Sequence, residues 1–421
     1  MFDPYARISV EEALGRVLER VHPLDVETVA LDDALGRVLA CDVLSDIDVN
    51  PFDNSSMDGY AVRSVDLATA AAEAPVALDV VGYIGAGSVF EGEVGPGETV
   101  RLMTGAPMPA GADAVVKYED VKVESGEGGT GSRVSFTKPV APGLYVRKAG
   151  EEFKAGQVAL GCGTVVGPYA LGMLASAGAA TVEVYRRPVL GLFTIGSELV
   201  DMTVVPGPGK IRDSNTWCLR GLAREAGAVV RVYGIVPDDK ASIDAALDRA
   251  LAECDIVVSS GGASRGDFDF IEEVISRRGE TVFAYLSLRP GKRQTLGMVA
   301  GKPVFGLSGN PAACSVGFEL LIRPALRAMQ GYPELSRPSI VAEVSAPIKK
   351  KEDRAFYQRG RVERAEDGRW VARECGTQSS ALLGDLERCN CLIVVPEESR
   401  GLVPGDTAEC LRIDLPEGSA L

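Results

Sequence analysis

The sequence predicts a multidomain protein of mixed α/β and β class. Between residues 187 and 331, short β-branched runs alternate with helical patterns, which is typical of a central α/β domain built on a largely parallel sheet. A Gly-rich stretch with strand periodicity over residues 51–144 predicts an inserted β-rich domain. A second β-rich stretch after residue 331 predicts a small C-terminal β domain or barrel.

The length of 421 residues is enough for two to four domains, each with its own core. We expect four, the first of which is discontinuous. They are residues 1–50 with 145–186 (helical and extended), 51–144 (inserted, β-rich), 187–331 (α/β) and 332–421 (C-terminal β).

The net charge of −15 argues against nucleic acid or an acidic membrane as partner. Any anionic ligand must therefore be held by local cations or by a metal. The nine cysteines form no C-x-x-C pair, which favours reduced thiols in a cytoplasmic protein. His22 is the only histidine, so histidine triads and histidine metal sites are excluded.

The N-terminus lacks the pattern of a signal peptide, and the uncharged stretch Ala155–Val182 needs an explanation. It contains six glycines and Pro168, which argues against a membrane helix. We expect a strand followed by a helix that begins near Pro168.

The chain begins with a predicted helix that is capped by Ser9 and Glu12 and runs to Val21. A second helix is predicted over Leu31–Val43. The run Pro51–Val62 then combines Phe, Met, Asp and Ser. A solvated loop is one explanation of this run, but its density of aromatic, Met and Asp residues favours a functional segment.

The predicted β-rich block, Val76–Phe136, has a loose hairpin tip at Glu124–Ser132. Within the block, Arg101–Val116 is dense in Gly and Pro, which indicates a rigid irregular loop. Thr104 offers a hydroxyl at its start.

The α/β region has five predicted strands and four predicted helices, and ligands bind such sheets at the carboxyl ends of the strands. The loops Ile195–Leu199, Ile211–Asn215 and Leu307–Ala312 should lie there, with Asn310 as the N-cap before Pro311. The strands are Val189–Thr194, Ala228–Val236, Asp255–Ser260, Val282–Leu288 and Val304–Leu307, and the helices are Ser214–Ala226, Lys240–Ala252, Phe270–Arg278 and Ala312–Met329.

The stretch Asp255–Phe270 reads as a strand, a Gly/Ser loop and a helix, an arrangement that often binds anions. It also carries two carboxylates, Asp267 and Asp269. They either hold a divalent cation that bridges to the anion or cap the helix. After residue 331 we expect a hairpin at Glu366–Arg369 and a short helix at Ala381–Cys389.

Six motifs occur in order along the chain, and together they are highly specific. They are MDGYA (57–61), MTGAPMPAGADAVV (103–116), GSEL (196–199), SGGASRGDFDF (260–270), RPGK (289–292) and GNP (309–311). The chain closely resembles the molybdopterin molybdenumtransferase family, which includes the E domain of gephyrin.

The resemblance implies an elongated four-part subunit, a molybdopterin-binding fold for the central domain, and a homodimer. It also implies a Mg²⁺-dependent reaction in which adenylylated molybdopterin is cleaved, AMP is released and molybdate is inserted. Partners in that pathway would be the adenylyltransferase and the molybdoenzymes that receive the cofactor.

The resemblance also assigns roles to residues. Asp58 and Thr104 fall in a different domain from the others, which would be explained by a cleft shared between subunits. The expected catalytic residues are Asp58, Thr104, Glu198, Asp213, Arg289, Arg359 and Ser380; the expected ligand-binding residues are Gly261, Gly262, Ser264, Lys292, Gly309 and Asn310; and the expected metal ligands are Asp269 and Asp213.

This chain departs from the family pattern at Tyr285 and Arg289, where the family usually has Lys, and at Ser308, where it has Pro. Arg289 keeps the charge but Tyr285 loses it, which leaves the choice between molybdate and tungstate open. The rival hypotheses are an adenylyltransferase-like enzyme, a tungstate-selective paralogue and a non-catalytic molybdopterin-binding scaffold.

Overall fold

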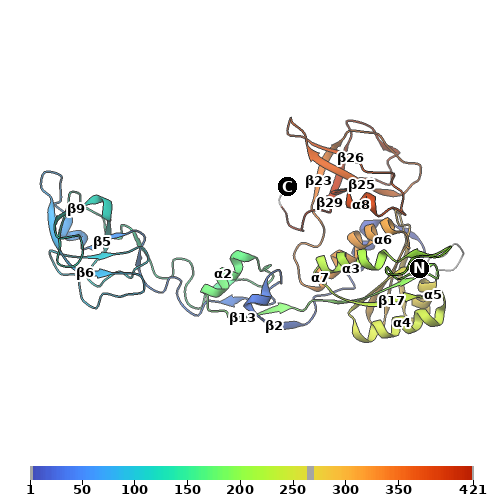
Figure 1. Cartoon of the computed structure of the whole chain (residues 1–421), viewed down its shortest axis with the longest axis horizontal. Helices are drawn as coiled ribbons and strands as arrows, with labels where there is room; N and C mark the ends of the chain where they lie inside the picture. Colours follow the sequence, from blue (N-terminus) through green and yellow to red (C-terminus); the bar gives the residue numbers. More distant parts are fainter. Residues whose placement is uncertain (1–2, 263–269, 420–421) are drawn as a thin grey trace. The chain divides into compact units, whose positions relative to one another are not determined.

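The computed structural model describes residues 3–262 and 270–419, which fold into two compact units (Figure 1). One unit comprises residues 1–27 and 184–421, and the other comprises residues 28–183. The four predicted domain boundaries remain predictions.

A seven-stranded sheet forms the centre of the first unit, and it confirms the predicted α/β domain. All neighbouring strands pair in parallel except β21, which is antiparallel to both of its neighbours. The strands, in spatial order, are β1 (Arg7–Ile8), β19 (Glu280–Leu286), β21 (Arg293–Val299), β22 (Lys302–Leu307), β18 (Ile256–Gly261), β14 (Val189–Ile195) and β17 (Val229–Val236).

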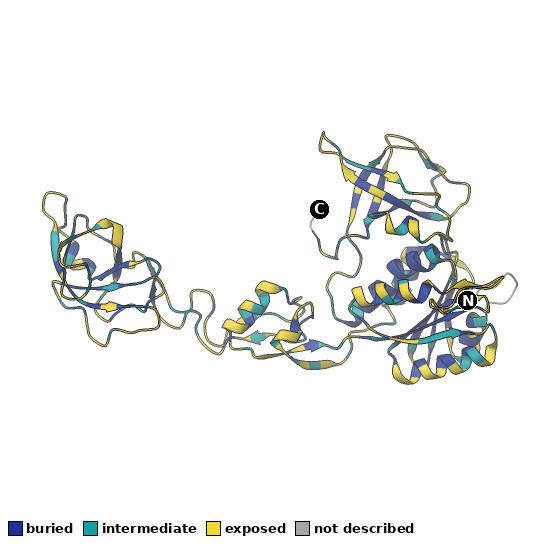
Figure 2. Cartoon of the chain, in the orientation of Figure 1, coloured by how far each residue is buried: buried dark blue, intermediate teal, exposed yellow. Residues whose placement is uncertain are grey.

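Helices cover both faces of this sheet because alternate strand residues point to opposite sides (Figure 1). Leu192 and Val258 lie in the core shared with α1, α3, α6 and α7, whereas Phe193 and Val257 pack against α4 and α5. Figure 2 shows the inner strands of the sheet buried and the outer helix faces exposed. The helices are α1 (Val10–Leu18), α3 (Asn215–Glu225), α4 (Lys240–Glu253), α5 (Phe270–Arg278), α6 (Pro311–Gly317) and α7 (Arg323–Met329), with a π-helical turn η4 (Phe318–Ile322) between the last two.

The predicted N-cap of α1 is confirmed, since the Ser9 side chain accepts a hydrogen bond from the backbone N–H of Glu12. The helix ends at Leu18, earlier than predicted. The predicted helix Leu31–Val43 is wrong. In its place the chain forms a single 3-10 turn, η1 (Leu31–Ala34), because Gly36 has a φ of 74° and Leu39 bonds to the backbone of Thr164 instead.

The unit of residues 28–183 contains a six-stranded sheet, which confirms the predicted β-rich block. The predicted hairpin tip lies between antiparallel β9 and β10. The strands, in spatial order, are β8 (Ala114–Lys117), β5 (Gly59–Val62), β7 (Glu98–Leu102), β6 (Val76–Ile84), β10 (Arg133–Phe136) and β9 (Val121–Ser125), with 3-10 turns η2 (Ser64–Leu67) and η3 (Tyr118–Asp120).

The rest of this unit consists of short strands and one helix. As predicted, a strand and then a helix that begins at Pro168 occupy the uncharged stretch. No described helix is long and apolar enough to span a bilayer. The elements are β2 (Val26–Ala30), β3 (Val43–Leu44), β4 (Asn54–Ser55), β11 (Val146–Arg147), β12 (Val158–Leu160), α2 (Pro168–Ser176) and β13 (Thr181–Tyr185).

The C-terminal region is a closed five-stranded β-barrel, as predicted, because β25 pairs with both β26 and β27. The hairpin at residues 366–369 connects β25 to β26, and the predicted short helix is α8 (Gly384–Glu387). The five barrel strands, in spatial order, are β25 (Ala355–Arg364), β26 (Trp370–Glu374), β23 (Ser339–Val344), β29 (Thr407–Arg412) and β27 (Cys391–Val395). The short strand β20 (Leu288–Arg289) pairs with β25 outside this ring, and β24 (Ile348–Lys349) pairs with β28 (Gly401–Leu402).

Candidate functional site

Asp213 is a buried carboxylate that three donors hold in place at the start of α3. The short strands β15 (Leu199–Val200) and β16 (Ile211–Arg212) bring it to the sheet edge. Its Oδ2 accepts from the hydroxyls of Thr194 at 2.8 Å and Thr216 at 2.6 Å, and its Oδ1 accepts from the backbone N–H of Thr216 at 3.1 Å. Each carboxylate oxygen can accept two hydrogen bonds, so one position on Oδ1 is not used by any described residue.

Asn215 joins three of the predicted loops. Its Nδ2 donates to Ser260 Oγ and to the backbone oxygen of Gly309, both at 2.8 Å. Its Oδ1 is buried and has no hydrogen-bond partner among the described residues, so the site presents an acceptor that a ligand can use. Sequence reasoning placed Asn215 in a loop but missed this role, which depends on two residues far away in the chain.

The glycines at the end of β18 pack closely against the neighbouring strand, and their predicted approach to a ligand stays a prediction. Gly261 and Gly262 have φ of 91° and 84°, and a Cβ on Gly261 would lie 2.2 Å from the backbone oxygen of Ile195. A Cβ on Gly309 would lie 3.3 Å from the Gly261 Cα. The predictions for Ser264, Asp267 and Asp269 fall outside the described residues.

Asn310 occupies the N-cap position of α6, as predicted, but its side chain makes no capping hydrogen bond. The amide of the α6 residue Ala312 instead donates to the backbone oxygen of Ser380 at 2.9 Å. This bond brings the segment of Ser380 to the Gly309–Asn310 turn, so a residue of the barrel lies beside the α/β domain.

Arg359, on β25, is a fully buried cation with unsatisfied donors. Its Nη2 donates to the backbone oxygen of Ser379 at 3.1 Å, whereas Nε and Nη1 have no partner among the described residues. Burial lowers the pKa of Arg359 because desolvation disfavours its charge. The charges of Asp385 and Glu374 oppose this effect, but Nε and Nη1 remain buried donors without a hydrogen-bond partner among the described residues, so the arrangement can accept an anionic ligand next to Ser380.

The other predicted residues of this unit show no direct contact with Asp213 among the described side chains. Arg289 donates to Glu352 at 2.8 Å and lies over the ring of Phe356 at 4.8 Å. Glu198 and Lys292 are exposed, and Tyr285 is half-buried under the guanidinium of Arg293. The structure thus groups Asp213, Gly261 and Gly309 through Asn215, and groups Arg359 with the segment of Ser380.

Asp58 and Thr104 meet in the other compact unit. The backbone N–H and the hydroxyl of Thr104 both donate to Asp58 Oδ1 at 2.7 Å. These two bonds, helped by the charge of Arg101, hold the pKa of Asp58 below its usual range. The predicted functional segment 51–62 therefore carries a carboxylate that stays ionised in mildly acidic solution.

The donor set around Asp213 is suited to Mg²⁺. In the described parts of the chain, no three His, Cys, Asp or Glu side chains are grouped so as to hold a metal ion. Mg²⁺ typically takes one or two carboxylates and completes its shell with water and phosphate. The free position on Asp213 Oδ1 meets that requirement.

Comparison with known families gives three matches that together span most of the chain. Residues 8–178 match "MoeA N-terminal region (domain I and II)", residues 191–328 match "Probable molybdopterin binding domain", and residues 341–413 match "MoeA C-terminal region (domain IV)".

Individual relatives match over nearly their full length. The chain is 36% identical to a molybdopterin molybdenumtransferase of Staphylococcus aureus (strain COL), over 96% of this chain and 95% of the relative. It is 37% identical to the molybdopterin molybdenumtransferase of Bacillus subtilis (strain 168), over 100% of this chain and 97% of the relative. A crystal structure described as a molybdopterin biosynthesis moea protein from Pyrococcus horikosii has a TM-score of 0.83 and 31% identity, with coverage of 97% and 99%.

Proposed function

The chain belongs to the MoeA family, and we propose that it is a molybdopterin molybdenumtransferase that inserts molybdate into adenylylated molybdopterin and releases AMP. Family membership supports the transfer of molybdenum to molybdopterin. The adenylylated substrate and the release of AMP are our proposals.

The buried guanidinium of Arg359 is the observation that carries this proposal. In a protein of net charge −15, an oxyanion needs a local cation, and Nε and Nη1 of Arg359 are buried donors that have no partner in the described part of the chain. We assign Arg359, with Ser380 and Arg289, to the binding of molybdate. A guanidinium in a desolvated site binds an oxyanion more strongly than in water, since unit charges 4 Å apart interact by about 4 kcal/mol at an effective dielectric of 20 and about 1 in water.

The Gly-rich edge of the sheet is suited to the phosphate and pterin parts of the substrate. Gly261 and Gly262 are buried and packed against Ile195, whereas Gly309 and Asn310 are exposed at the same edge, where their backbone can approach a ligand. Ser264 and Lys292 are assigned to the same ligand by the resemblance.

We propose that Asp213 and Asp269 hold Mg²⁺, with Glu198 as an auxiliary carboxylate. When bound, Mg²⁺ supplies positive charge to the phosphates of the substrate. Thr194 and Thr216 hold the Asp213 carboxylate in one orientation. The Asp269→Asn variant should lose Mg²⁺-dependent turnover. Unchanged rates would remove Asp269 from the metal site.

We also propose a cytoplasmic homodimer whose site is shared between subunits. Asp58 and Thr104 lie in the unit of residues 28–183, and Asp213 and Arg359 lie in the other. Asp58→Asn and Asp213→Asn subunits should each be inactive alone. Mixed and reassociated, they should regain turnover because a mixed dimer has one intact site. No recovery in verified mixed dimers would contradict a shared site.

The experiment that tests the function combines purified protein, adenylylated molybdopterin, Mg²⁺ and molybdate, and follows AMP. Release of AMP without consumption of ATP supports the transferase over an adenylyltransferase. Absence of AMP above background, with the nucleotide still bound, would favour a scaffold. Replacement of molybdate by tungstate in a parallel reaction measures the oxyanion preference left open by Tyr285.

A further inference from the structure

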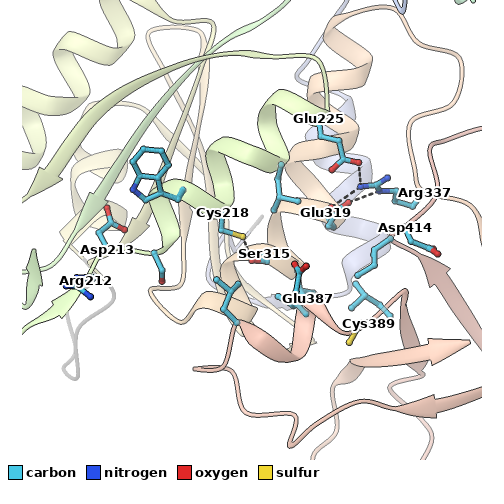
Figure 3. Close-up of a pocket in the computed structure, with 18 of the residues that line it drawn as sticks. Arg212, Asp213, Cys218, Glu225, Ser315, Glu319, Arg337, Glu387, Cys389 and Asp414 are labelled. Atoms are coloured by element: carbon cyan, nitrogen blue, oxygen red, sulfur yellow. Dashed lines mark hydrogen bonds and ion pairs between the residues drawn. The ribbon is translucent and has the colours of Figure 1, made fainter. Parts of the chain in front are cut away.

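A cavity of about 710 Å³ runs along α3 from Asp213 to α8 and β27 of the barrel region (Figure 3). Its lining comes from the start and outer face of α3, from α6 and η4, and from α8 and strand β27 of the barrel. Cavities of roughly 300–1,000 Å³ bind small molecules in proteins. None of the residues assigned above except Asp213 lines it, so it is an unassigned space that opens at the proposed site.

The middle of the cavity is apolar. Leu222, Val316, Leu386 and Leu392 contribute to its walls. The thiol of Cys218 and the carboxylate of Glu387 also line it, and the hydroxyl of Ser315 already donates to the backbone oxygen of Pro311 at 2.8 Å. A phosphate or an oxyanion would lose its hydration there without compensation, so this part of the cavity favours an uncharged, flat group.

The two ends differ in charge. At the end near Asp213 lies Arg212, whose exposed guanidinium donates through Nε to the backbone oxygen of Val204 at 3.0 Å and makes no other hydrogen bond to a described residue. At the far end, Arg337 is satisfied by Glu225 at 2.9 Å and by Glu319 at 3.2 Å, as Figure 3 shows. The end at Asp213 is therefore the one that suits a phosphate, and the far end offers carboxylates to N–H donors.

Trp217 is one of the residues that line the cavity. Its side chain is 47% exposed, although it is the largest on the amphipathic helix α3. It shares the start of α3 with Asp213. Aromatic side chains of this kind stack on heterocyclic bases.

From these observations we propose that the cavity along α3 binds the planar nitrogen heterocycle of the substrate, stacked on Trp217, with the phosphates towards Arg212. This inference rests on the proposed function, because adenylylated molybdopterin carries two such rings, adenine and pterin. Adenine and the pyrimidine ring of the pterin are flat and uncharged, and each carries an exocyclic amine that can donate to the carboxylates at the far end.

Trp217 fluorescence tests this directly, because the chain has only two tryptophans. In a Trp370→Phe background all tryptophan emission comes from Trp217. Titration with AMP and, separately, with 6-hydroxymethylpterin should give saturable quenching by one of them. Quenching by AMP alone assigns the adenine end, and quenching by the pterin alone assigns the pterin end. No quenching by either at saturating concentration overturns the proposal.

Affinity measurements on substituted proteins provide the second readout. By calorimetry, Trp217→Ala should weaken binding of the quenching ligand at least about fivefold, whereas Trp217→Phe should keep the affinity within about twofold. Tyr169→Ala, which removes a ring that is 91% exposed on α2, is the matched control and should change nothing. Equal affinity of Trp217→Ala and wild type would overturn the proposal. If wild type also releases AMP, the proposed function stands while this inference fails.

Discussion

At the scale of single residues, Thr104 sets the ionisation of Asp58. Its hydroxyl and backbone N–H both donate to Asp58 Oδ1, which keeps the pKa of that carboxyl low. Thr104→Val removes the hydroxyl, so the pKa of Asp58 should rise. The acidic limb of the pH profile of kcat/KM should then move to higher pH.

The matched control for this prediction is Thr203→Val. Thr203 makes the same pair of bonds to Asp201, at 2.9 and 2.6 Å, in a different loop. Its profile should coincide with that of wild type. An acidic limb that does not move in Thr104→Val would show that the ionisation of Asp58 is not needed for turnover.

Replacing Arg359 by Met should reduce turnover without reducing the stability of the fold. Arg359→Met replaces a buried, largely unpaired cation by an apolar chain, so the free energy of unfolding should stay unchanged or increase by about 1–4 kcal/mol. Molybdate-dependent release of AMP should fall roughly 10²-fold. Urea unfolding and a rate assay measure the two effects.

Arg361→Met, at an exposed position on the same strand, is the control and should change neither quantity much. A strongly destabilised Arg359→Met protein would mean that neighbouring carboxylates already compensate the guanidinium, and the argument for an anion there would fail.

At the scale of elements, the end of β18 requires glycine. Gly261→Ala would add a Cβ at 2.2 Å from a backbone oxygen in a residue with φ of 91°, so the strand end must shift. We expect a loss of about 1–3 kcal/mol in unfolding free energy and weaker binding of AMP. Gly207→Ala, where nothing lies within 4 Å, should stay within about 0.5 kcal/mol of wild type. Unchanged stability and affinity of Gly261→Ala would contradict the role proposed for the Gly-rich edge of the sheet.

The sequence predicted elements well where hydrophobic periodicity was strong and poorly where tertiary contacts decided. The five predicted strands and four predicted helices of the α/β region are all present. Strand β21 was missed because its buried Gln294 and Thr295 look like surface residues, although Gln294 in fact donates to the backbone of Ala313. The helix expected at Leu31–Val43 was wrong because its apolar spacing serves pairing with residues 164–166.

The sequence predicted individual residues of the candidate site but not the contacts between them. The motifs located the glycines and the family resemblance located Asp213, Arg359 and Ser380, but no local pattern reveals the links between them. Asn215 bonds to Ser260 and Gly309, residues 45 and 94 positions away. The cavity along α3 likewise depends on how the barrel lies against α3 and α6.

At the scale of the whole molecule, a buried ion network ties the C-terminal segment to α7. The carboxylate of Glu417, whose side chain is 1% exposed, bonds to Arg323 and lies 3.2 Å from Arg327. Burial alone would raise the pKa of Glu417, but the hydrogen bond and charge of Arg323 outweigh it and keep the pKa below its usual range. Glu417→Gln should cost about 3–5 kcal/mol at pH 7.

The sign of the pH effect follows from this lowered pKa. The stabilisation is complete above the unfolded pKa of about 4.3 and is lost as the pH falls through the lower folded value. The difference in unfolding free energy between wild type and Glu417→Gln should therefore shrink below about pH 4. Urea unfolding at several pH values measures it. Glu253→Gln, which breaks a half-exposed pair with Arg231, should cause no measurable change. If the difference in unfolding free energy between wild type and Glu417→Gln did not depend on pH, the stabilisation would not come from the charge of Glu417.

The most direct test of the account measures molybdenum in the product. Wild-type protein with adenylylated molybdopterin, Mg²⁺ and molybdate is sampled over time, and AMP and pterin-bound molybdenum are quantified together. We predict that the two rise in parallel, and that Arg359→Met yields neither above background. Release of AMP with no molybdenum retained by the pterin would contradict the claim that this chain is a molybdenumtransferase.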